Sequence, residues 1–343
     1  MAKMVKSVRM SDIASALNVS TVTVSKALSG QKGVSEALRE KIVKLAEEMG
    51  YQSSSASKKN NESYNIGVII SEMYQDYYDS FYWKMYQEVA GKAMQKQCFT
   101  MLEILSLEDE RKHHPLKLVS ENKVDGLIVI GKLSAEYIRY LKMEVRIPVM
   151  FLDFYDSDVS ADAVISDGFY GCYLMTNYLF DHGHDSITYV GTLMATDSIN
   201  DRYLGYIKSM MEHGKSQGDA HQINDRLTDN KLCDEEGNPI LKLPEKIPDA
   251  FVCNCDTIAV NLVKMLEEQG LNVPEDVSVV GFDNFTIPGQ TRIGITTYEV
   301  DITEMACRAV NTLIKKISGQ PYRSGIQIVE GRLVEKDSVA FRN

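Results

Sequence analysis

The sequence predicts a small all-α headpiece followed by an α/β body of two doubly wound parallel-sheet subdomains. Three short segments with helical periodicity come first, and from Asn65 onward apolar runs alternate with amphipathic helical patterns. The net charge of the chain changes sign near the same boundary. Residues 1–60 contain ten Lys and Arg against five Asp and Glu, a net +5, so the rest of a chain of net charge −11 carries −16. This split indicates a polyanionic partner for the headpiece, although charge alone also fits a solvated helical surface.

The composition is that of an ordinary globular chain. Its 343 residues are 44% hydrophobic and 25% charged, enough to form two or three cores. No apolar run approaches the length of a membrane span, and a polar helical pattern stands where a secretory peptide needs an apolar stretch, so we expect a cytoplasmic protein with no membrane contact. The six cysteines are too scattered for a disulfide framework and are interpreted as reduced core thiols.

Each of the three helical segments has an apolar stripe. Asn18 breaks the first pattern, Ser20 is placed to cap the second helix, and Ser35 is placed to cap the third. The predicted buried positions are Met10, Ile13, Ala14, Leu17, Val24, Ala27, Leu28, Leu38, Ile42, Leu45 and Met49. Three helices of these lengths predict a helix-turn-helix domain over residues 1–52. In that motif the second helix enters the major groove of DNA, which explains why its sequence contains no acidic residue.

The stretch NVSTVTVSKALSGQKGVSEALREKIVKLAEEMGY resembles the DNA-binding headpiece of the lactose-repressor/galactose-repressor (LacI/GalR) family. The resemblance implies that Thr21, Val22 and Lys26 meet base edges; Lys26 can donate to guanine, and Val22 offers only apolar contact, for example to a thymine methyl group. The full expected DNA-binding set is Ser20, Thr21, Val22, Thr23, Ser25, Lys26, Ser29 and Lys58. The partner would be double-stranded operator DNA. The alternative is a helical hairpin that serves only as a core.

Residues 53–64 are rich in Ser, Lys and Asn and are predicted to be a flexible linker or hinge. Family members usually place a short hinge helix here, with a Leu that wedges into the minor groove. Asn60 occupies that position, and a polar side chain cannot unstack a base step as an apolar wedge does, so it stays open whether a hinge helix forms. Lys58 and Lys59 either follow the phosphates or keep the linker solvated.

Residues 65–343 read as an α/β domain. Apolar or β-branched runs occur at 66–70, 99–105, 126–130, 148–154, 163–166, 186–191, 250–253 and 277–282. Strands of this kind, buried on both faces and separated by helices, predict parallel sheets. We expect one subdomain at about 65–162 and 296–325, and a second at about 163–295 and 326–343. A late helical segment after residue 300 would cross back to the first subdomain.

Phrases such as VDGLIVIG, SINDRYLGY and VPEDVSVVGFDN resemble the effector-binding and dimerisation domain of the same family, which is similar to periplasmic sugar-binding proteins. The resemblance implies a homodimer and a small-molecule effector, a sugar, in a cleft between the subdomains. The expected effector-binding residues are Tyr77, Tyr78, Asp153, Ser198, Arg202, Cys255 and Asp283. The two tyrosines fit a core equally well, and Arg202 with Asp283 also fits a structural ion pair within the second subdomain.

Two departures from the family pattern bear on the effector. Cys255-Asp256 stands where many members have Asn-Asp, which replaces an amide donor with a thiol. The polar insert at 218–248 prevents placement of the aromatic residue that relatives carry in this region. The effector is therefore not expected to be a familiar monosaccharide.

Motifs for other chemistry are missing from the sequence. There is no dinucleotide or triphosphate loop and no nucleophile elbow, and the spacings of His182-x-His184, His113-His114 and Cys253-x-Cys255 do not suit a metal site. We therefore expect no cofactor, no metal and no enzymatic activity. The predicted function is that of a nucleoid-associated transcriptional regulator, by family habit a repressor, whose operator affinity responds to the effector. The alternative is a cytosolic sugar-binding or sugar-modifying protein with a structural N-terminal helical domain.

Overall fold

The computed structural model describes residues 10–28, 33–49, 63–74, 80–156, 161–216, 218–227, 230–285 and 292–342. The chain divides into two compact units. One unit is the headpiece, residues 1–64 together with the short turn at 96–98, and the other is the body, which contains the rest of the chain.

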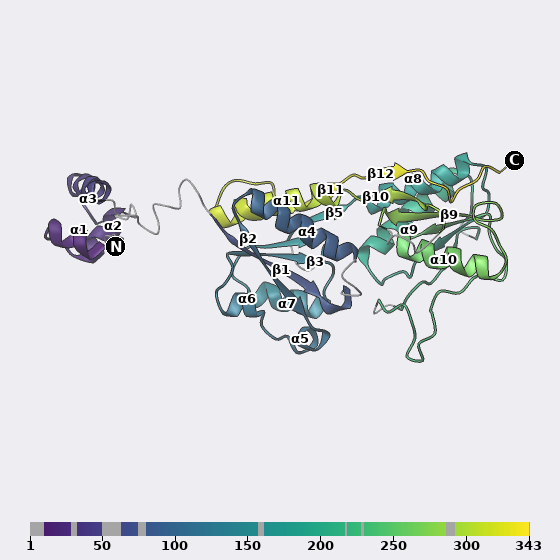
Figure 1. Cartoon of the computed structure of the whole chain (residues 1–343), viewed down its shortest axis with the longest axis horizontal. Helices are drawn as coiled ribbons and strands as arrows, with labels where there is room; N and C mark the ends of the chain where they lie inside the picture. Colours follow the sequence, from purple (N-terminus) through teal and green to yellow (C-terminus); the bar gives the residue numbers. More distant parts are fainter. Residues whose placement is uncertain are drawn as a thin grey trace, which may run out of the picture. The chain divides into compact units, whose positions relative to one another are not determined.

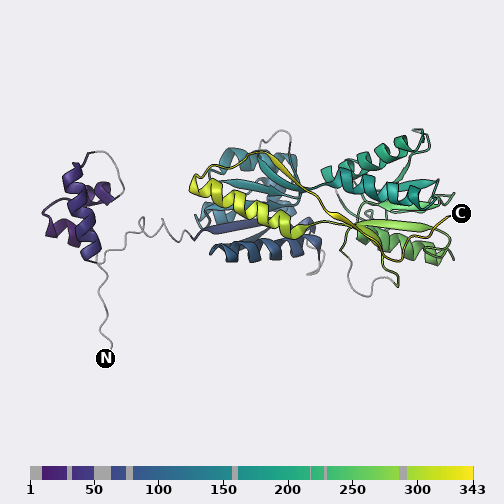
Figure 2. The same ribbon diagram turned by 90° about the horizontal axis from the view of Figure 1, so that it is seen from above.

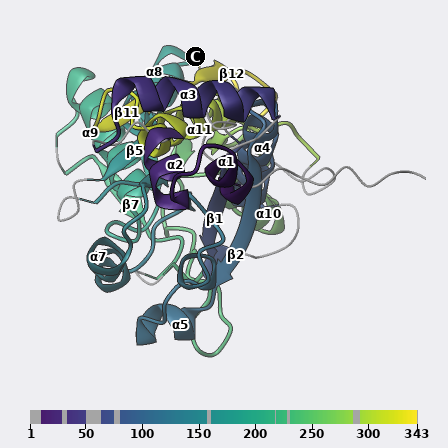
Figure 3. The ribbon, with the colours of Figure 1, turned by 90° about the vertical axis from the view of Figure 1, so that its left-hand side faces the viewer.

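The headpiece consists of three helices, α1 (Met10–Ala16), α2 (Thr21–Leu28) and α3 (Glu36–Glu48), which pack against one another (Figure 3). Asn18, with φ 52°, turns the chain between α1 and α2 in the left-handed region that Asn tolerates. The buried core residues are Ile13, Ala14, Val24, Ala27, Ile42 and Ala46, with Leu17, Leu28, Leu38, Leu45 and Met49 partly buried around them. The three predicted apolar stripes are therefore confirmed wherever the side chains are described.

The first subdomain of the body is a parallel sheet in the order β11-β5-β4-β3-β1-β2. Its strands are β1 (Asn65–Ser71), β2 (Phe99–Leu105), β3 (Gly126–Ile130), β4 (Val149–Leu152), β5 (Asp162–Ser166) and β11 (Ile326–Val329). Figure 1 shows α4 (Phe81–Gln95) and α11 (Ile302–Ser318) on one face. The other face is covered by α5 (Leu107–Lys112), α6 (Lys117–Ser120) and α7 (Ala135–Glu144). The turn η2 (Glu72–Tyr74) follows β1.

The second subdomain is a sheet in the order β12-β10-β9-β8-β6-β7, parallel except for β12, which is antiparallel to β10. Its strands are β6 (Ile187–Val190), β7 (His221–Ile223), β8 (Ala250–Cys253), β9 (Ser278–Asp283), β10 (Thr296–Glu299) and β12 (Arg332–Val334). The helices are α8 (Gly168–Asp181), α9 (Asp197–Glu212) and α10 (Asp256–Glu268). Figure 2 shows the two lobes of the body side by side, with α11 on the first.

The predicted subdomain boundaries are each a few residues too early. β5 and β11 belong to the first sheet and β10 to the second, so the chain crosses between lobes after Ser166, Glu299 and Val329 rather than at 162, 295 and 325. The reason is that each of these strands completes its hydrogen-bonded pairing in one sheet before the connection leaves it. The prediction that the segment after residue 300 forms a helix on the first subdomain is confirmed by α11, which packs on β3, β4 and β5.

One predicted buried strand is an edge strand. FTMLEIL forms β2 at the end of the first sheet, and Phe99 is 68% exposed. The prediction that it is buried on both faces was wrong because apolar composition does not reveal that a strand has only one neighbour. Among the helices of the described ranges, none is both long and apolar enough to span a bilayer.

Candidate functional site

Helix α2 carries most of the residues expected to contact DNA. Thr21, Val22, Ser25 and Lys26 are exposed, with Val22 61% exposed although it is apolar. The exposed Val22 side chain is free of the headpiece core and accessible for an apolar contact. Ser29 and Lys58 lie outside the described residues.

Ser20 and Thr23 act together at the N-terminus of α2. The Ser20 hydroxyl accepts a hydrogen bond from the Thr23 backbone N–H at 3.0 Å, so Ser20 caps the helix as predicted. The two hydroxyl oxygens also lie 2.8 Å apart. Both hydroxyls therefore sit at the positive end of the helix, where a phosphate is stabilised.

Arg39 of α3 holds the other end of α2. Its Nη1 donates to the carbonyl oxygens of Ala27 at 2.8 Å and Lys26 at 3.3 Å. These carbonyls belong to the last turn of α2, where intrahelical partners run out and a cation is favourable. The bonds fix the orientation of α2 against α3.

The candidate effector site lies where the two subdomains of the body meet. Asp153 directly follows β4 in the first subdomain, with φ 68°, and is 8% exposed. The Tyr82 hydroxyl donates to its Oδ2 at 3.1 Å. Burial is the main cause that raises the pKa of Asp153 to about 7, while the positive charge of Arg202 opposes the rise and the negative charge of Asp283 adds to it. Asp153 is therefore near enough to both of these residues of the second subdomain for their charges to act on it.

Arg202, on α9, is the central cation of this junction. Its Nη2 donates to Asp283 Oδ1 at 3.0 Å, its Nη1 donates to the Asn254 carbonyl oxygen, and its guanidinium carbon lies 3.9 Å from the centre of the Phe282 ring. Arg202 is only 5% exposed, and its Nε has no hydrogen-bond partner. The structure thus contains the ion pair within the second subdomain that the sequence offered as an alternative. The charges of both members also act on Asp153.

Backbone conformation fixes where Asp283 and Arg202 lie. Asp283 ends β9 with φ 98°, a conformation that L-residues rarely adopt and that often marks functional sites. Gly205, one turn after Arg202, lies against α8, where an added Cβ would come 2.1 Å from the Phe169 carbonyl oxygen. Only glycine allows α9 to approach α8 this closely.

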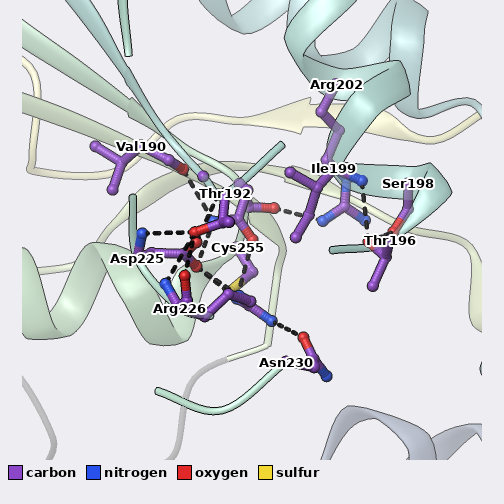
Figure 4. A network of polar contacts seen from close by, with 12 residues as sticks. Val190, Thr192, Thr196, Ser198, Ile199, Arg202, Asp225, Arg226, Asn230 and Cys255 are labelled. Carbon is purple, nitrogen blue, oxygen red and sulfur yellow. Dashed lines mark hydrogen bonds and ion pairs between the residues drawn. The ribbon is translucent and has the colours of Figure 1, made fainter. Parts of the chain in front are cut away.

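Cys255 is the N-cap residue of α10 and belongs to a polar network drawn in Figure 4. Arg226 donates from Nε to Asp225 at 2.7 Å and from Nη1 to Asn230 at 2.8 Å. Its Nη2 donates to Asn254 Oδ1 at 3.2 Å and lies 3.9 Å from the sulfur of Cys255. Burial raises the pKa of Cys255 to about 11, with the charge of Arg226 acting in the opposite direction, so the thiol is neutral.

Asp225 anchors this network to the sheet. Besides Arg226, it accepts hydrogen bonds from the Thr192 backbone N–H at 2.8 Å and from Asn254 Nδ2 at 2.9 Å. Sequence reasoning missed Asp225 and Arg226 because they lie in the insert that could not be aligned. The signal available in the sequence was an adjacent acid and base one residue after a short β-compatible run, HQI.

The remaining predicted residues are placed as follows. Ser198 lies in the first turn of α9, half-buried, with its Oγ 3.0 Å from Thr196 Oγ1, one turn before Arg202 (Figure 4). Tyr77 and Tyr78 lie outside the described residues. The tyrosines that the structure brings to Asp153 are Tyr74 and Tyr82, whose ring centroids are 4.5 Å apart.

The subdomains also contact each other beside these residues. Lys132, after β3, forms an ion pair with Asp197 at the start of α9, with Nζ 2.9 Å from Oδ2. The Tyr155 hydroxyl lies 3.4 Å from Asp201 Oδ1. A ligand that changes the separation of the subdomains would change these contacts.

Comparison with known proteins defines the class of protein. Residues 9–54 match the model of bacterial regulatory proteins of the lacI family, and residues 176–339 match the periplasmic binding protein-like domain. A helix-turn-helix headpiece joined to a two-lobed ligand-binding body is a DNA-binding transcriptional regulator, not an enzyme.

The relatives agree with this class over the whole chain. The HTH-type transcriptional repressor PurR of Vibrio atlanticus is 26% identical over 343 residues, covering 97% of this chain and 98% of that protein. PurR of Actinobacillus pleuropneumoniae is 27% identical, covering 89% and 90%. The structures of the CelR–cellobiose complex (TM-score 0.68, 18% identity, 96% and 99% covered) and of the lac repressor dimer bound to operator and the anti-inducer ONPF (TM-score 0.64, 21% identity, 98% and 100% covered) share its fold. The predicted resemblance to the LacI/GalR family is therefore confirmed: the headpiece matches the lacI-family model, and the chain is similar along nearly its whole length to HTH-type transcriptional repressors.

Proposed function

We propose that this regulator is a cytoplasmic repressor that binds a partly palindromic operator as a homodimer, with one headpiece per half-site. Thr21, Val22 and Lys26 meet base edges, and the hydroxyls at the start of α2 hold phosphates. The exposed, acid-free first turn of α2 supports these roles. The name of the PurR relatives supports repression, and the operator-bound lac repressor dimer supports a dimeric arrangement.

The effector is a carbohydrate held between the subdomains. The observation that carries this proposal is the meeting of Asp153, from the first subdomain, with the Arg202–Asp283 pair from the second. Carboxylates accept and guanidinium groups donate in the directional, charge-assisted bonds that fix hydroxyl groups. A similar fold holds cellobiose in the CelR complex. Ser198, one turn before Arg202, adds a hydroxyl to the same side.

Effector binding acts by changing how the subdomains close on each other. The Lys132–Asp197 and Tyr155–Asp201 contacts bridge the subdomains, so a ligand that draws Asp153 toward Arg202 alters them. The effector must bind the two arrangements with different affinity, and coupling of this kind typically amounts to about 1–3 kcal/mol. Asn60 lies outside the described residues, so the expectation about the hinge helix stays a prediction.

The DNA-binding proposal is tested with a salt titration of the full chain on a random-sequence duplex. The logarithm of the binding constant should fall steeply with the logarithm of salt, with a slope of about −0.9 for each phosphate neutralised. The matched control is the Thr21→Asp/Lys26→Glu variant, which changes two exposed residues and should bind more weakly with a shallower slope. A flat titration for the wild type would instead favour a ligand-binding protein with a structural headpiece.

A further inference from the structure

The turn after β7 brings a second guanidinium to the effector side of the second subdomain. Arg226 is held by Asp225, Asn230 and Asn254, so three of its nitrogens have fixed partners. Its side chain is only 14% exposed. A guanidinium with five N–H groups keeps donors in a fixed direction when some of them are bonded in this way.

Asn254 links Arg226 to the Arg202–Asp283 pair: Arg226 Nη2 donates to Asn254 Oδ1 at 3.2 Å, and Arg202 Nη1 donates to the Asn254 carbonyl oxygen. The positive charge of Arg226 lowers the pKa of Asp283, against the rise caused by burial, and it acts in the same direction on Tyr74 of the first subdomain. Its Nη2 lies next to Cys255. It is therefore close both to the carboxylate that pairs with Arg202 and to a group across the junction.

The neighbouring thiol makes Arg226 the stronger donor at this end of the site. A neutral thiol is a weak hydrogen-bond donor, whereas a guanidinium forms charge-assisted bonds to oxygen. Beside Cys255, Arg226 is thus the group that can donate a charge-assisted hydrogen bond to a ligand oxygen.

Three cations of the site are already paired with carboxylates. Arg202 pairs with Asp283, Arg226 with Asp225, and Lys132 with Asp197. Lys336 donates to Asn284 and lies near the Asp256 carboxyl group. Asp153 and Asp201 add further carboxyl groups. Among the described residues of the site, an anionic ligand would therefore meet carboxyl groups and cations that already have bonded partners, and burying a charge without a partner is costly.

Because the cations Arg202, Arg226 and Lys132 already have carboxylate partners, we propose that Arg226 is a specificity-determining residue of the effector site, where it donates to ligand oxygens beside Cys255, and that the effector is an uncharged polyhydroxylated molecule rather than a sugar phosphate or sugar acid. This inference rests on the proposed function, because it assumes that the effector binds at the junction of the subdomains. An uncharged ligand is the class that can bind without breaking the ion pairs of the site.

The ligand class is tested by thermal unfolding of the full chain with matched compounds. The probes are glucose, galactose, ribose and cellobiose, each compared with the phosphate or the uronic or aldonic acid of the same sugar. An uncharged member should raise Tm, and its charged counterpart should raise it less or not at all. A charged counterpart that stabilises more than its parent sugar would overturn the inference and leave the proposed function standing. A panel with no binding compound would count against the carbohydrate effector itself.

The role of Arg226 is tested with the compound that stabilises the wild type most. The Asp225→Asn/Arg226→Gln double variant removes the ion pair without leaving a buried unpaired charge, and it should weaken the Kd by at least tenfold in calorimetry. The matched control is Arg332→Gln, which removes an exposed arginine of β12 paired with Glu299 and should leave the Kd unchanged. Cys255→Ser should change the Kd less than threefold. An unchanged Kd in the double variant, or a larger loss in Cys255→Ser, would overturn the role of Arg226.

Discussion

The headpiece and the subdomain junction use polar residues in opposite ways. The second helix of the headpiece exposes Thr21, Ser25 and Lys26 and places an exposed valine among them. At the junction Arg202 is only 5% exposed and Asp153 only 8% exposed. Both have hydrogen-bond partners, Asp283 for Arg202 and Tyr82 for Asp153. Exposed charges are screened by salt, whereas buried pairs are screened much less. The headpiece should therefore respond mainly to ionic strength, and the junction mainly to pH and to loss of a partner.

The largest effect is expected at the centre of the junction. Arg202→Met leaves the buried Asp283 carboxylate without its ion pair and the Asn254 carbonyl without its donor, which should lower the free energy of unfolding of the body by about 3–5 kcal/mol. Urea unfolding monitored by circular dichroism measures this change. The Arg202→Met/Asp283→Asn double variant should lose clearly less, because no carboxylate remains unpaired. Equal losses in both variants would show that the ion pair is not what stabilises the junction.

The next effect is a pH dependence that comes from Asp153. Its folded pKa of about 7 lies above the ordinary value of 3.8, so between about pH 4 and pH 7 the folded state holds a proton that the unfolded state has lost. The stability contributed by this group is complete below pH 4 and falls as the pH rises toward 7, by at most about 1.4 kcal/mol per pH unit.

Comparison of the wild type with Asp153→Asn isolates this contribution from that of other groups. The variant should gain stability relative to the wild type as the pH rises from 4 to 7, and the difference should become constant above pH 7. His184, buried with its pKa lowered to about 4, has the opposite dependence and is common to both proteins. A difference that does not vary with pH would mean that Asp153 is ionised throughout the range.

A smaller effect is expected at the surface of the headpiece. Lys26→Glu should weaken binding to a duplex selected from a random pool by about 1–3 kcal/mol, because it removes a base-edge donor and introduces a negative charge near phosphates. The variant should unfold at the same temperature as the wild type, since Lys26 is exposed. Fluorescence anisotropy measures the binding. A change in Tm as large as the change in affinity would indicate a structural role instead.

The smallest effect tests whether the headpiece also depends on an internal contact. Arg39→Gln removes the charge that holds the last carbonyls of α2 and should weaken binding to the selected duplex by about 1 kcal/mol without changing the salt slope. Lys41→Gln, an exposed change on the same helix, is the matched control. A slope reduced by about 0.9 in Arg39→Gln would mean that Arg39 contacts a phosphate directly.

The sequence predicted the parts of the fold whose burial leaves a pattern. GLIVI and AFVC form strands with the predicted bounds because a strand covered on both faces is apolar throughout. β7, β11 and β12 were not predicted, because strands of three or four residues at or near an edge carry no comparable signal. The headpiece helices were predicted from periodicity and from Ser20 as a cap.

The candidate site was less accessible to sequence reasoning. The resemblance placed Asp153, Arg202 and Asp283, which the structure brings together. Arg226 was missed because its importance depends on a turn that sets it beside Asn254, far along the chain. Tyr74 and Tyr82 were not predicted, because gapless counting does not show which side chains turn toward Asp153, and the prediction for Tyr77 and Tyr78 stays a prediction.

The central claim is that a ligand at the subdomain junction sets the DNA affinity of the headpiece. The most direct measurement is the Kd of the full chain for a duplex selected from a random pool, with and without a saturating amount of the compound that raises Tm most. The account predicts a change of about 5- to 150-fold that disappears in the Asp225→Asn/Arg226→Gln variant at the same concentration of that compound. The same Kd with and without the compound in the wild type would contradict it.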